Sequence, residues 1–100
     1  MGASSENVQS LLLDEILDIS SVTELKARFL NILENKTSVS VDARNVGRVD
    51  TAVLQVMAAF VQDAKTQEQS VQWQEPSVAF SQSADLLGLR DVLGLDGHSA

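Results

Sequence analysis

The chain has 100 residues, 44% of them hydrophobic, and a formal net charge of −7. This length suits one domain with one hydrophobic core, and the composition is too apolar for a disordered chain. The seven lysine and arginine residues are spread along the chain, which disfavours binding to nucleic acid or to an anionic membrane surface. The sequence contains no cysteine, which excludes disulfides, thiolate metal sites and cysteine nucleophiles.

The position of the single histidine and the length of the apolar runs bear on metal binding and on membrane insertion. His98 is the single histidine and lies close to the end of the chain, so we expect it to be solvated and assign no metal or cofactor site. Apolar runs such as residues 11–13 are far shorter than the roughly 20 residues that span a bilayer. Residues 1–10 lack the basic and apolar segments of a secretory signal. We therefore expect a cytoplasmic protein without direct membrane insertion.

Hydrophobic periodicity predicts the first elements. We expect a flexible N-terminus over residues 1–7, a strand over about 8–13 and a turn or short extended piece near 14–18. From Ser20 onward the apolar residues recur at spacings of three and four, which predicts an amphipathic helix over about 21–35.

Capping chemistry supports the bounds of this helix. Ser21 and Glu24 have the spacing of a capping box, in which the hydroxyl accepts from a backbone N–H one turn ahead and the carboxylate reaches back. Asn35 is typical of a helix end. Upstream, Asp14 and Glu15 are neighbours in sequence, which is typical of a solvated turn and not of a general acid/base pair.

The next segment alternates between apolar and polar residues. Val39 and Val41 fall on one face of residues 37–43 and polar residues on the other, which predicts a strand. The segment "RNVGRVD" is then expected to be a loop, with Asn45 and Gly47 as turn formers. One glycine is too few for a phosphate-cradling loop of the nucleotide-binding type.

The strongest helical pattern covers residues 51–69, where apolar residues such as Val53 and Met57 share one face. Asp50 stands directly before the first turn and is a natural N-cap. The backbone N–H groups of a helix start carry a partial positive charge. We therefore expect the Thr51 hydroxyl to lie exposed beside a ready-made site for an anion.

The C-terminal third repeats the pattern of a strand followed by a helix. Alternation over residues 70–76 predicts a strand in which Trp73 packs into the core. A helix over about 77–88 follows, opened by Ser77 or Pro76. Gly88 is the predicted end of this helix. Its predicted buried face consists of Phe80, Ala84 and Leu87. The segment "LRDVLGLDG" is expected to add a short helical turn that closes the core.

Strand and helix thus alternate three times along the chain. Right-handed crossovers between successive strands place the strands side by side and parallel. The sequence predicts a small single-domain α/β fold over residues 8–95, with a mostly parallel or mixed sheet packed against helices. Residues 96–100 are expected to form a flexible tail.

This order, with "GRVDTAVLQVM" at the second junction of strand, loop and helix, resembles the STAS domain, the fold of anti-sigma factor antagonists. The resemblance covers about residues 8–93. Its most specific part is an aspartate followed by a hydroxyl residue at the start of the helix, then a small residue and a leucine: Asp50, Thr51, Ala52, Val53 and Leu54. The segment "DLLGLRDVLGL" is also similar to bacterial members of the family.

The resemblance implies a non-enzymatic regulatory module that binds a protein partner through the corner at Asp50 and Thr51. It maps the family's phosphorylation site to Thr51, where phosphate would act as an off switch. We expect Asn45, Arg48 and Leu54 to contact the partner too, although Arg48 could equally pair with Asp50. The implied partner is an anti-sigma factor, another serine/threonine kinase-like ATPase or a chemotaxis signalling protein, and the chain itself is expected to be a monomer or a weak dimer.

Two alternatives remain open at this point. Family members often carry a second hydroxyl and a glycine where this chain has Ala52 and Val53, and the threonine version is similar to the small STAS subunit of phospholipid-transport ABC ATPases. The other alternative is a small enzyme or ligand carrier that uses Arg48, Asp50 and Thr51. A threonine nucleophile needs a base, and the sequence offers none, so we expect no enzyme. If the corner has no function, Asp50 is only an N-cap that stabilises the helix by ~1 kcal/mol.

Overall fold

The computed structural model describes residues 8–95. The elements in chain order are β1 (Val8–Leu12), β2 (Ile16–Leu17), the 3₁₀ turn η2 (Ile19–Ser21), α1 (Val22–Glu34), β3 (Ser38–Asp42), β4 (Arg48–Val49), α2 (Thr51–Thr66), β5 (Val71–Gln74), α3 (Val78–Leu86) and α4 (Arg90–Leu93). The predictions for residues 1–7 and 96–100, including His98, lie outside the described residues.

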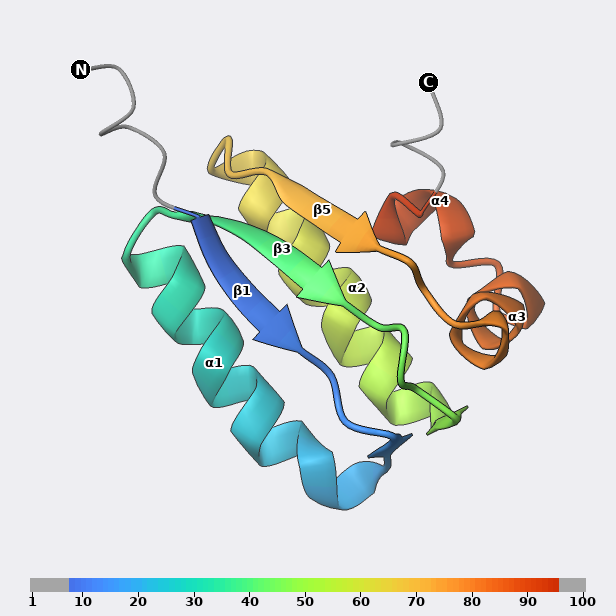
Figure 1. Cartoon of the computed structure of the whole chain (residues 1–100). Helices are drawn as coiled ribbons and strands as arrows, with labels where there is room; N and C mark the ends of the chain where they lie inside the picture. The colour runs from blue at the N-terminus through green and yellow to red at the C-terminus, as the bar shows by residue number, and fades with distance from the viewer. Residues whose placement is uncertain (1–7, 96–100) are drawn as a thin grey trace.

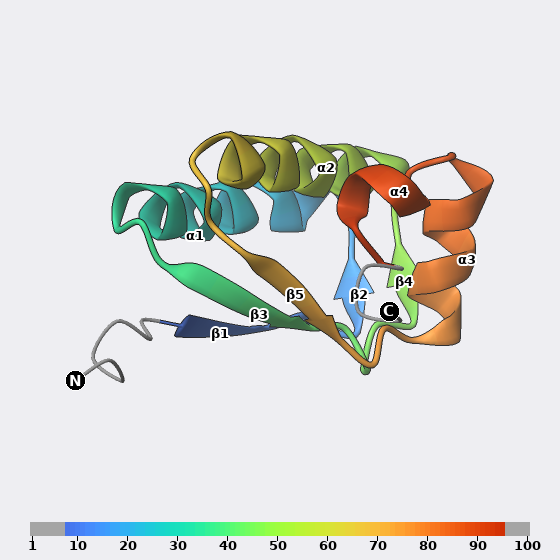
Figure 2. The same ribbon diagram turned by 90° about the horizontal axis from the view of Figure 1, so that it is seen from above.

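Strands β1, β3 and β5 form a parallel sheet in the order β1-β3-β5 (Figure 1). In this register Leu11 lies beside Val41, and Val41 beside Trp73. These three side chains are buried because α1 and α2 cover their face of the sheet (Figure 2). Ser10 and Gln72, on the opposite face, are exposed. The α/β class and the parallel sheet are therefore confirmed.

A second, two-stranded parallel sheet joins β2 to β4, with Ile16 beside Arg48 and Leu17 beside Val49. The prediction of a continuous loop from residue 44 to residue 50 was wrong at this point. Two residues are too few to show alternation, and the pairing depends on a contact between distant segments. This small sheet fixes the position of the junction that precedes α2.

The start of α1 differs from the prediction. The Asp18 carboxylate accepts from the Ser20 backbone N–H at 3.0 Å, and the Ser21 hydroxyl accepts from the Asp18 backbone N–H at 3.2 Å. The predicted capping box of Ser21 and Glu24 is wrong, because Ser21 belongs to η2 and its side chain makes no capping bond to α1. Glu24 instead accepts from Arg28 at 3.3 Å.

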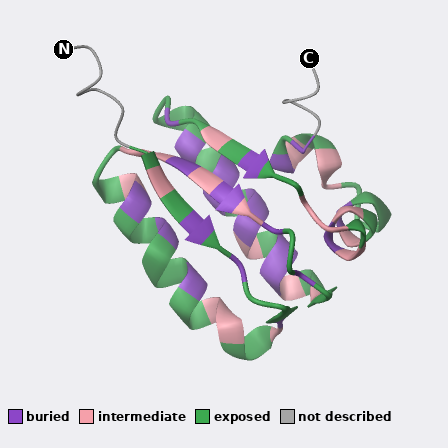
Figure 3. Ribbon diagram, in the orientation of Figure 1, coloured by how far each residue is buried: buried purple, intermediate pink, exposed green. Residues whose placement is uncertain are grey.

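The buried residues of the sheet, α1 and α2 form one hydrophobic core, and Figure 3 shows where along these elements they lie. The rings of Phe29 and Phe60 stack with centroids 4.2 Å apart, joining α1 to α2. Leu93 and Leu95 are almost fully buried, so the predicted turn that closes the core is confirmed. The predicted burial of Leu87 is wrong: it follows the last residue of α3 and is 40% exposed. Within residues 8–95, no helix combines the length and hydropathy needed to cross a bilayer.

Candidate functional site

The corner at Asp50 and Thr51 lies where β4 passes into α2. Asp50 occupies the N-cap position with extended backbone, φ −81° and ψ 156°. Its carbonyl accepts from the backbone N–H groups of Val53 at 3.1 Å and Leu54 at 3.2 Å. Thr51 is the first residue of α2 and is exposed. The predicted N-cap position of Asp50 is therefore confirmed.

The Asp50 carboxylate does not cap the helix. It makes no capping hydrogen bond, and its Oδ1 lies 3.5 Å from Arg48 Nε. The Arg48 side chain is 69% exposed and that of Asp50 is 37% exposed, so solvent screens this pair and it adds little stability. Because the carboxylate is directed at Arg48, it does not occupy the N–H groups of Thr51 and Ala52, the first two of α2, where an anion is favoured.

The backbone of the preceding loop is held by β2 and by Glu15, the residue before it. The N–H groups of Gly47 and Arg48 donate to the Glu15 carbonyl at 2.7 Å and 3.1 Å, and the Asp50 N–H donates to the Leu17 carbonyl at 2.9 Å. These bonds come from a segment far away in sequence. They place Arg48, Asp50 and Thr51 on a supported backbone.

A second support comes from the turn that precedes α3. The Ser77 hydroxyl donates to the Val46 carbonyl at 2.6 Å and accepts from the Phe80 N–H at 3.0 Å. The Ser77 N–H donates to the Ala43 carbonyl at 3.1 Å. Ser77 therefore caps α3 and fixes the loop before β4 at once. The sequence indicates the first role through its position before a helix, and nothing in it indicates the second.

Asp18 is an acidic neighbour of Arg48 that was not predicted from the sequence. Hydrogen bonds from the Ser20 hydroxyl and backbone N–H hold the pKa of Asp18 below its ordinary value, and the positive charge of Arg48 adds to this effect. Arg48 thus acts on Asp18 as well as on Asp50. Asp18 could have been noticed as a capping residue, but its proximity to Arg48 depends on the pairing of β2 with β4.

The comparison with protein families decides the identity of the fold. A family model described as "Mlab, STAS domain" matches residues 2–95. The chain belongs to the STAS domain family. A comparison with curated proteins finds no match for this chain. STAS domains mediate contacts between proteins, so this chain is a regulatory protein-interaction module of the anti-sigma factor antagonist type.

The STAS domain brings only part of the predicted contact set to one surface. Arg48, Asp50 and Thr51 are adjacent at the corner, and Asn45 is exposed in the turn of the same loop. Leu54 has no exposed surface, so the prediction that it contacts a partner is wrong. It lies one turn into α2 and packs into the core, where it supports the corner from beneath.

The remaining chemical candidates of the STAS domain are weak. Asp14 and Glu15 are both exposed in the link between β1 and β2. No group of three or more histidine, cysteine, aspartate or glutamate side chains within residues 8–95 could hold a metal ion. Trp73 is 6% exposed, so its predicted place in the core is confirmed.

One further surface of the STAS domain adjoins the corner. A hollow of about 620 Å³ runs between α1 and α2, and Ala52, the neighbour of Thr51, lines it. We call this surface the α1–α2 groove, and its lining residues come from two helices. On α1 they are Lys26, Phe29, Leu30 and Leu33, and on α2 they are Ala52, Gln55, Val56, Ala59, Phe60 and Asp63.

Proposed function

We propose that this STAS domain is a non-enzymatic, cytoplasmic signalling module of bacterial type that binds a serine/threonine kinase-like ATPase through the corner at Asp50 and Thr51. Phosphorylation of Thr51 by that partner releases the complex. The observation that carries the proposal is the exposed Thr51 hydroxyl on the first residue of α2, beside an aspartate whose carboxylate is engaged with Arg48.

Electrostatics support a switch at this position. A phosphate on Thr51 adds about −1.5 to −2 charge and three acceptor oxygens. The start of a helix favours an anion, and the Asp50 carboxylate makes no capping bond there, so the domain itself tolerates the phosphate. A partner surface that is apolar or acidic at this place loses affinity through desolvation and repulsion. The bonds from Glu15 and Leu17 hold the backbone, so the partner is released without refolding of the corner.

The non-enzymatic part of the proposal rests on the chemistry of the same corner. A threonine nucleophile needs an adjacent base. The carboxylate next to Thr51 belongs to Asp50, which lies 3.5 Å from Arg48 and is partly exposed. This carboxylate is directed at Arg48, and no hydrogen bond joins it to the Thr51 hydroxyl among the bonds of the described residues. The domain therefore serves as the acceptor of a phosphoryl group supplied by the partner.

A second version of the proposal is a small regulatory subunit of a phospholipid-transport ABC ATPase. The sequence favours it at one place, because Ala52 and Val53 stand where many signalling members of the family carry a hydroxyl and a glycine. In this version Thr51 contacts the ATPase and stays unmodified. A chemotaxis signalling protein is a third kind of partner for the same surface.

The test is a capture experiment from native lysate, read by mass spectrometry, with wild type, Thr51→Glu and Thr66→Glu as baits. Thr66 is an exposed threonine at the far end of α2 and serves as the matched control. We expect wild type and Thr66→Glu to capture one ATPase that Thr51→Glu loses. Equal capture by all three baits would mean that Thr51 is only the first residue of a helix and not part of the interface.

A second step separates the versions of the proposal. The captured ATPase is incubated with ATP and with purified wild type or Thr51→Ala, and both are examined for phosphothreonine. Phosphate on residue 51 of wild type, and none on Thr51→Ala, supports the phosphorylation switch. Capture of an ABC ATPase that leaves Thr51 unmodified supports the transport version.

A further inference from the structure

The α1–α2 groove combines an aromatic floor with an exposed apolar rim. Phe29 and Phe60 form its floor through their stacked rings, and each is 5% exposed. Leu30 stands on the rim and is 58% exposed, although leucine is an apolar residue on a helix whose buried face is already complete. Leu30 is therefore available for contact with another molecule, and apolar residues of both helices adjoin it in the groove.

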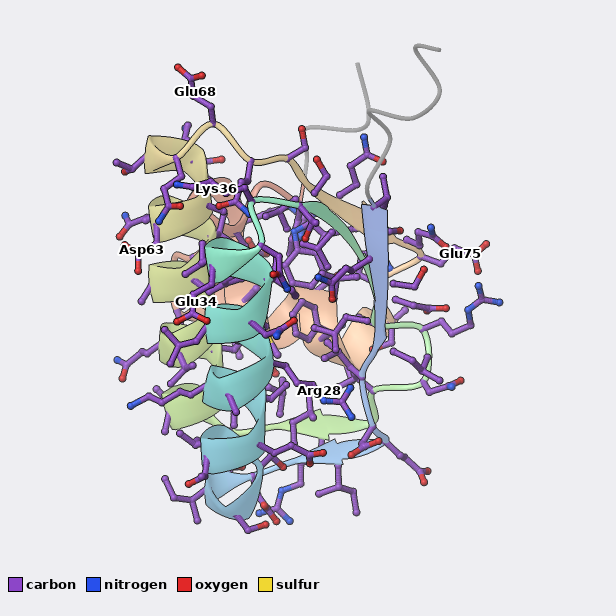
Figure 4. All side chains as sticks on the ribbon, turned by 90° about the vertical axis from the view of Figure 1, so that its left-hand side faces the viewer. Arg28, Glu34, Lys36, Asp63, Glu68 and Glu75 are labelled. Carbon is purple, nitrogen blue, oxygen red and sulfur yellow. The ribbon has the colours of Figure 1, made fainter. Side chains whose placement is uncertain are left out.

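Two of the residues that line this groove are charged, Lys26 and Asp63. Strands β1, β3 and β5 are parallel, so the crossover helices α1 and α2 run in the same direction (Figure 1). Lys26 lies in the first half of α1, toward the end where Ala52 lines the groove, and Asp63 lies in the last turns of α2. Glu34 and Lys36 lie toward the same end as Asp63 (Figure 4), and Lys36 Nζ donates to Gln67 Oε1 at 3.2 Å. The lining of the groove thus carries a positive charge, Lys26, toward one end and a negative charge, Asp63, toward the other, with apolar residues between them.

We infer that the α1–α2 groove binds an amphipathic helix of the protein partner. The apolar ridge of that helix lies between Leu30 and Val56, an acidic residue of the partner faces Lys26, and a basic residue faces Asp63. A helix fits because two parallel helices present an open furrow that receives the ridge of a third. The end charges are exposed, so they set the orientation of the bound helix more than its affinity.

A second copy of this chain suits the groove less well. It presents the same concave surface, and two hollows that face one another leave the middle unfilled. Each copy also carries a net charge of −7, which opposes self-association. The inference rests on the proposed function and deepens it, because Ala52 joins the groove to the Thr51 corner and one partner can cover both.

The experiment is photo-crosslinking of the full chain in native lysate, with a photoreactive phenylalanine derivative at position 30 or at position 86. Leu86 is the matched control, a leucine 87% exposed on α3 and outside the groove. We expect position 30, and not position 86, to cross-link to a partner segment with apolar residues at helical spacing, an acidic residue near one end and a basic residue near the other. A cross-link to a second copy, to a segment without this pattern, or to nothing overturns the inference.

A synthetic peptide of the cross-linked segment then serves as the probe. We expect Leu30→Glu to weaken its binding to the full chain by about tenfold or more, and Leu86→Glu to leave binding unchanged. Lys26→Glu should weaken binding severalfold, and exchange of the facing acidic residue of the peptide for lysine should restore it. Binding that ignores Leu30→Glu overturns the inference, and circular dichroism shows that each variant is folded.

The two proposals fail separately in this design. If Thr51→Glu loses the partner while Leu30→Glu retains it, the corner is the interface and the groove is not. If the cross-link from position 30 persists in Thr51→Glu, the groove binds the partner and the switch at Thr51 is wrong.

Discussion

The indole Nε1 of Trp73 donates to the carbonyl of Leu93 at 2.8 Å, which ties the end of the sheet to the last helix. Both residues are buried, and the Trp73 ring also packs against Phe80 with centroids 5.2 Å apart. A helix of four residues such as α4 has no stability of its own in water. Trp73 therefore holds the C-terminal segment in the position in which it closes the core.

Trp73→Phe removes this hydrogen bond and part of the buried ring. We expect the free energy of unfolding to fall by about 2 kcal/mol, because the Leu93 carbonyl stays buried and a void opens beside it. The measurement is urea unfolding followed by circular dichroism, since Trp73 is the only tryptophan. The control is Gln72→Phe on the exposed face of the same strand, expected to change stability by less than about 0.5 kcal/mol. Equal midpoints for Trp73→Phe and wild type would contradict the assigned role.

Asp50 and Ser77 occupy equivalent N-cap positions and should respond differently to alanine. Ser77→Ala loses the bonds to Val46 and Phe80 and should cost about 1–2 kcal/mol. Asp50→Ala loses only a solvent-screened pair with Arg48 and should cost about 0.5 kcal/mol or less. Chemical unfolding of both variants gives the comparison. A larger loss for Asp50→Ala would mean that its carboxylate caps α2 in solution.

Local pattern was enough to predict the long elements. The helices around Phe29 and Phe60 and the strand around Val39 followed from spacings within a few residues, and their bounds agree to within about three residues. The parallel sheet followed from the order of these elements and the handedness of crossovers.

The parts that position the site depend on distant contacts and could not be predicted. The pairing of β2 with β4 and the bond from Ser77 to Val46 join segments that show no local signal of their neighbours. The prediction for Leu54 was wrong because it was based on closeness in sequence to the corner. One helical turn after Thr51, the side chain of Leu54 lies in the core. The position of the corner in the sequence could therefore be predicted, but the set of residues exposed on it could not.

The glycines 47 and 88 differ in the backbone that they need. A Cβ at Gly47 would meet its nearest atoms, both from Glu15, at 3.7 Å, an ordinary contact, and Gly47 has no left-handed backbone. Gly47→Ala should therefore leave the free energy of unfolding within about 0.5 kcal/mol of wild type. Gly88, with φ +69°, ends α3 in the left-handed region, so Gly88→Ala should cost about 1 kcal/mol. Thermal unfolding of the two variants measures the difference. A loss of stability in Gly47→Ala as large as that in Gly88→Ala would contradict the prediction.

Asp18 should contribute to stability in a pH-dependent way. Its pKa in the folded state lies below the ordinary value of 3.8, chiefly through the Ser20 hydroxyl and N–H and then through Arg48. A lowered pKa means that the ionised form stabilises the fold. The contribution is fully present above the ordinary pKa and is lost as the pH falls through the folded value.

Asp18→Asn should therefore make the loss of stability at acidic pH less steep than in wild type. Some pH dependence remains in this variant, because hydrogen bonds from Arg44 lower the pKa of Asp42 in the same sense. Urea midpoints measured from neutral pH down to about pH 2 give the two curves. Since the Ser20 hydroxyl is the larger cause, Ser20→Ala should flatten the curve more than Arg48→Ala. The reverse order would mean that the charge of Arg48, and not the turn at Ser20, governs the ionisation of Asp18.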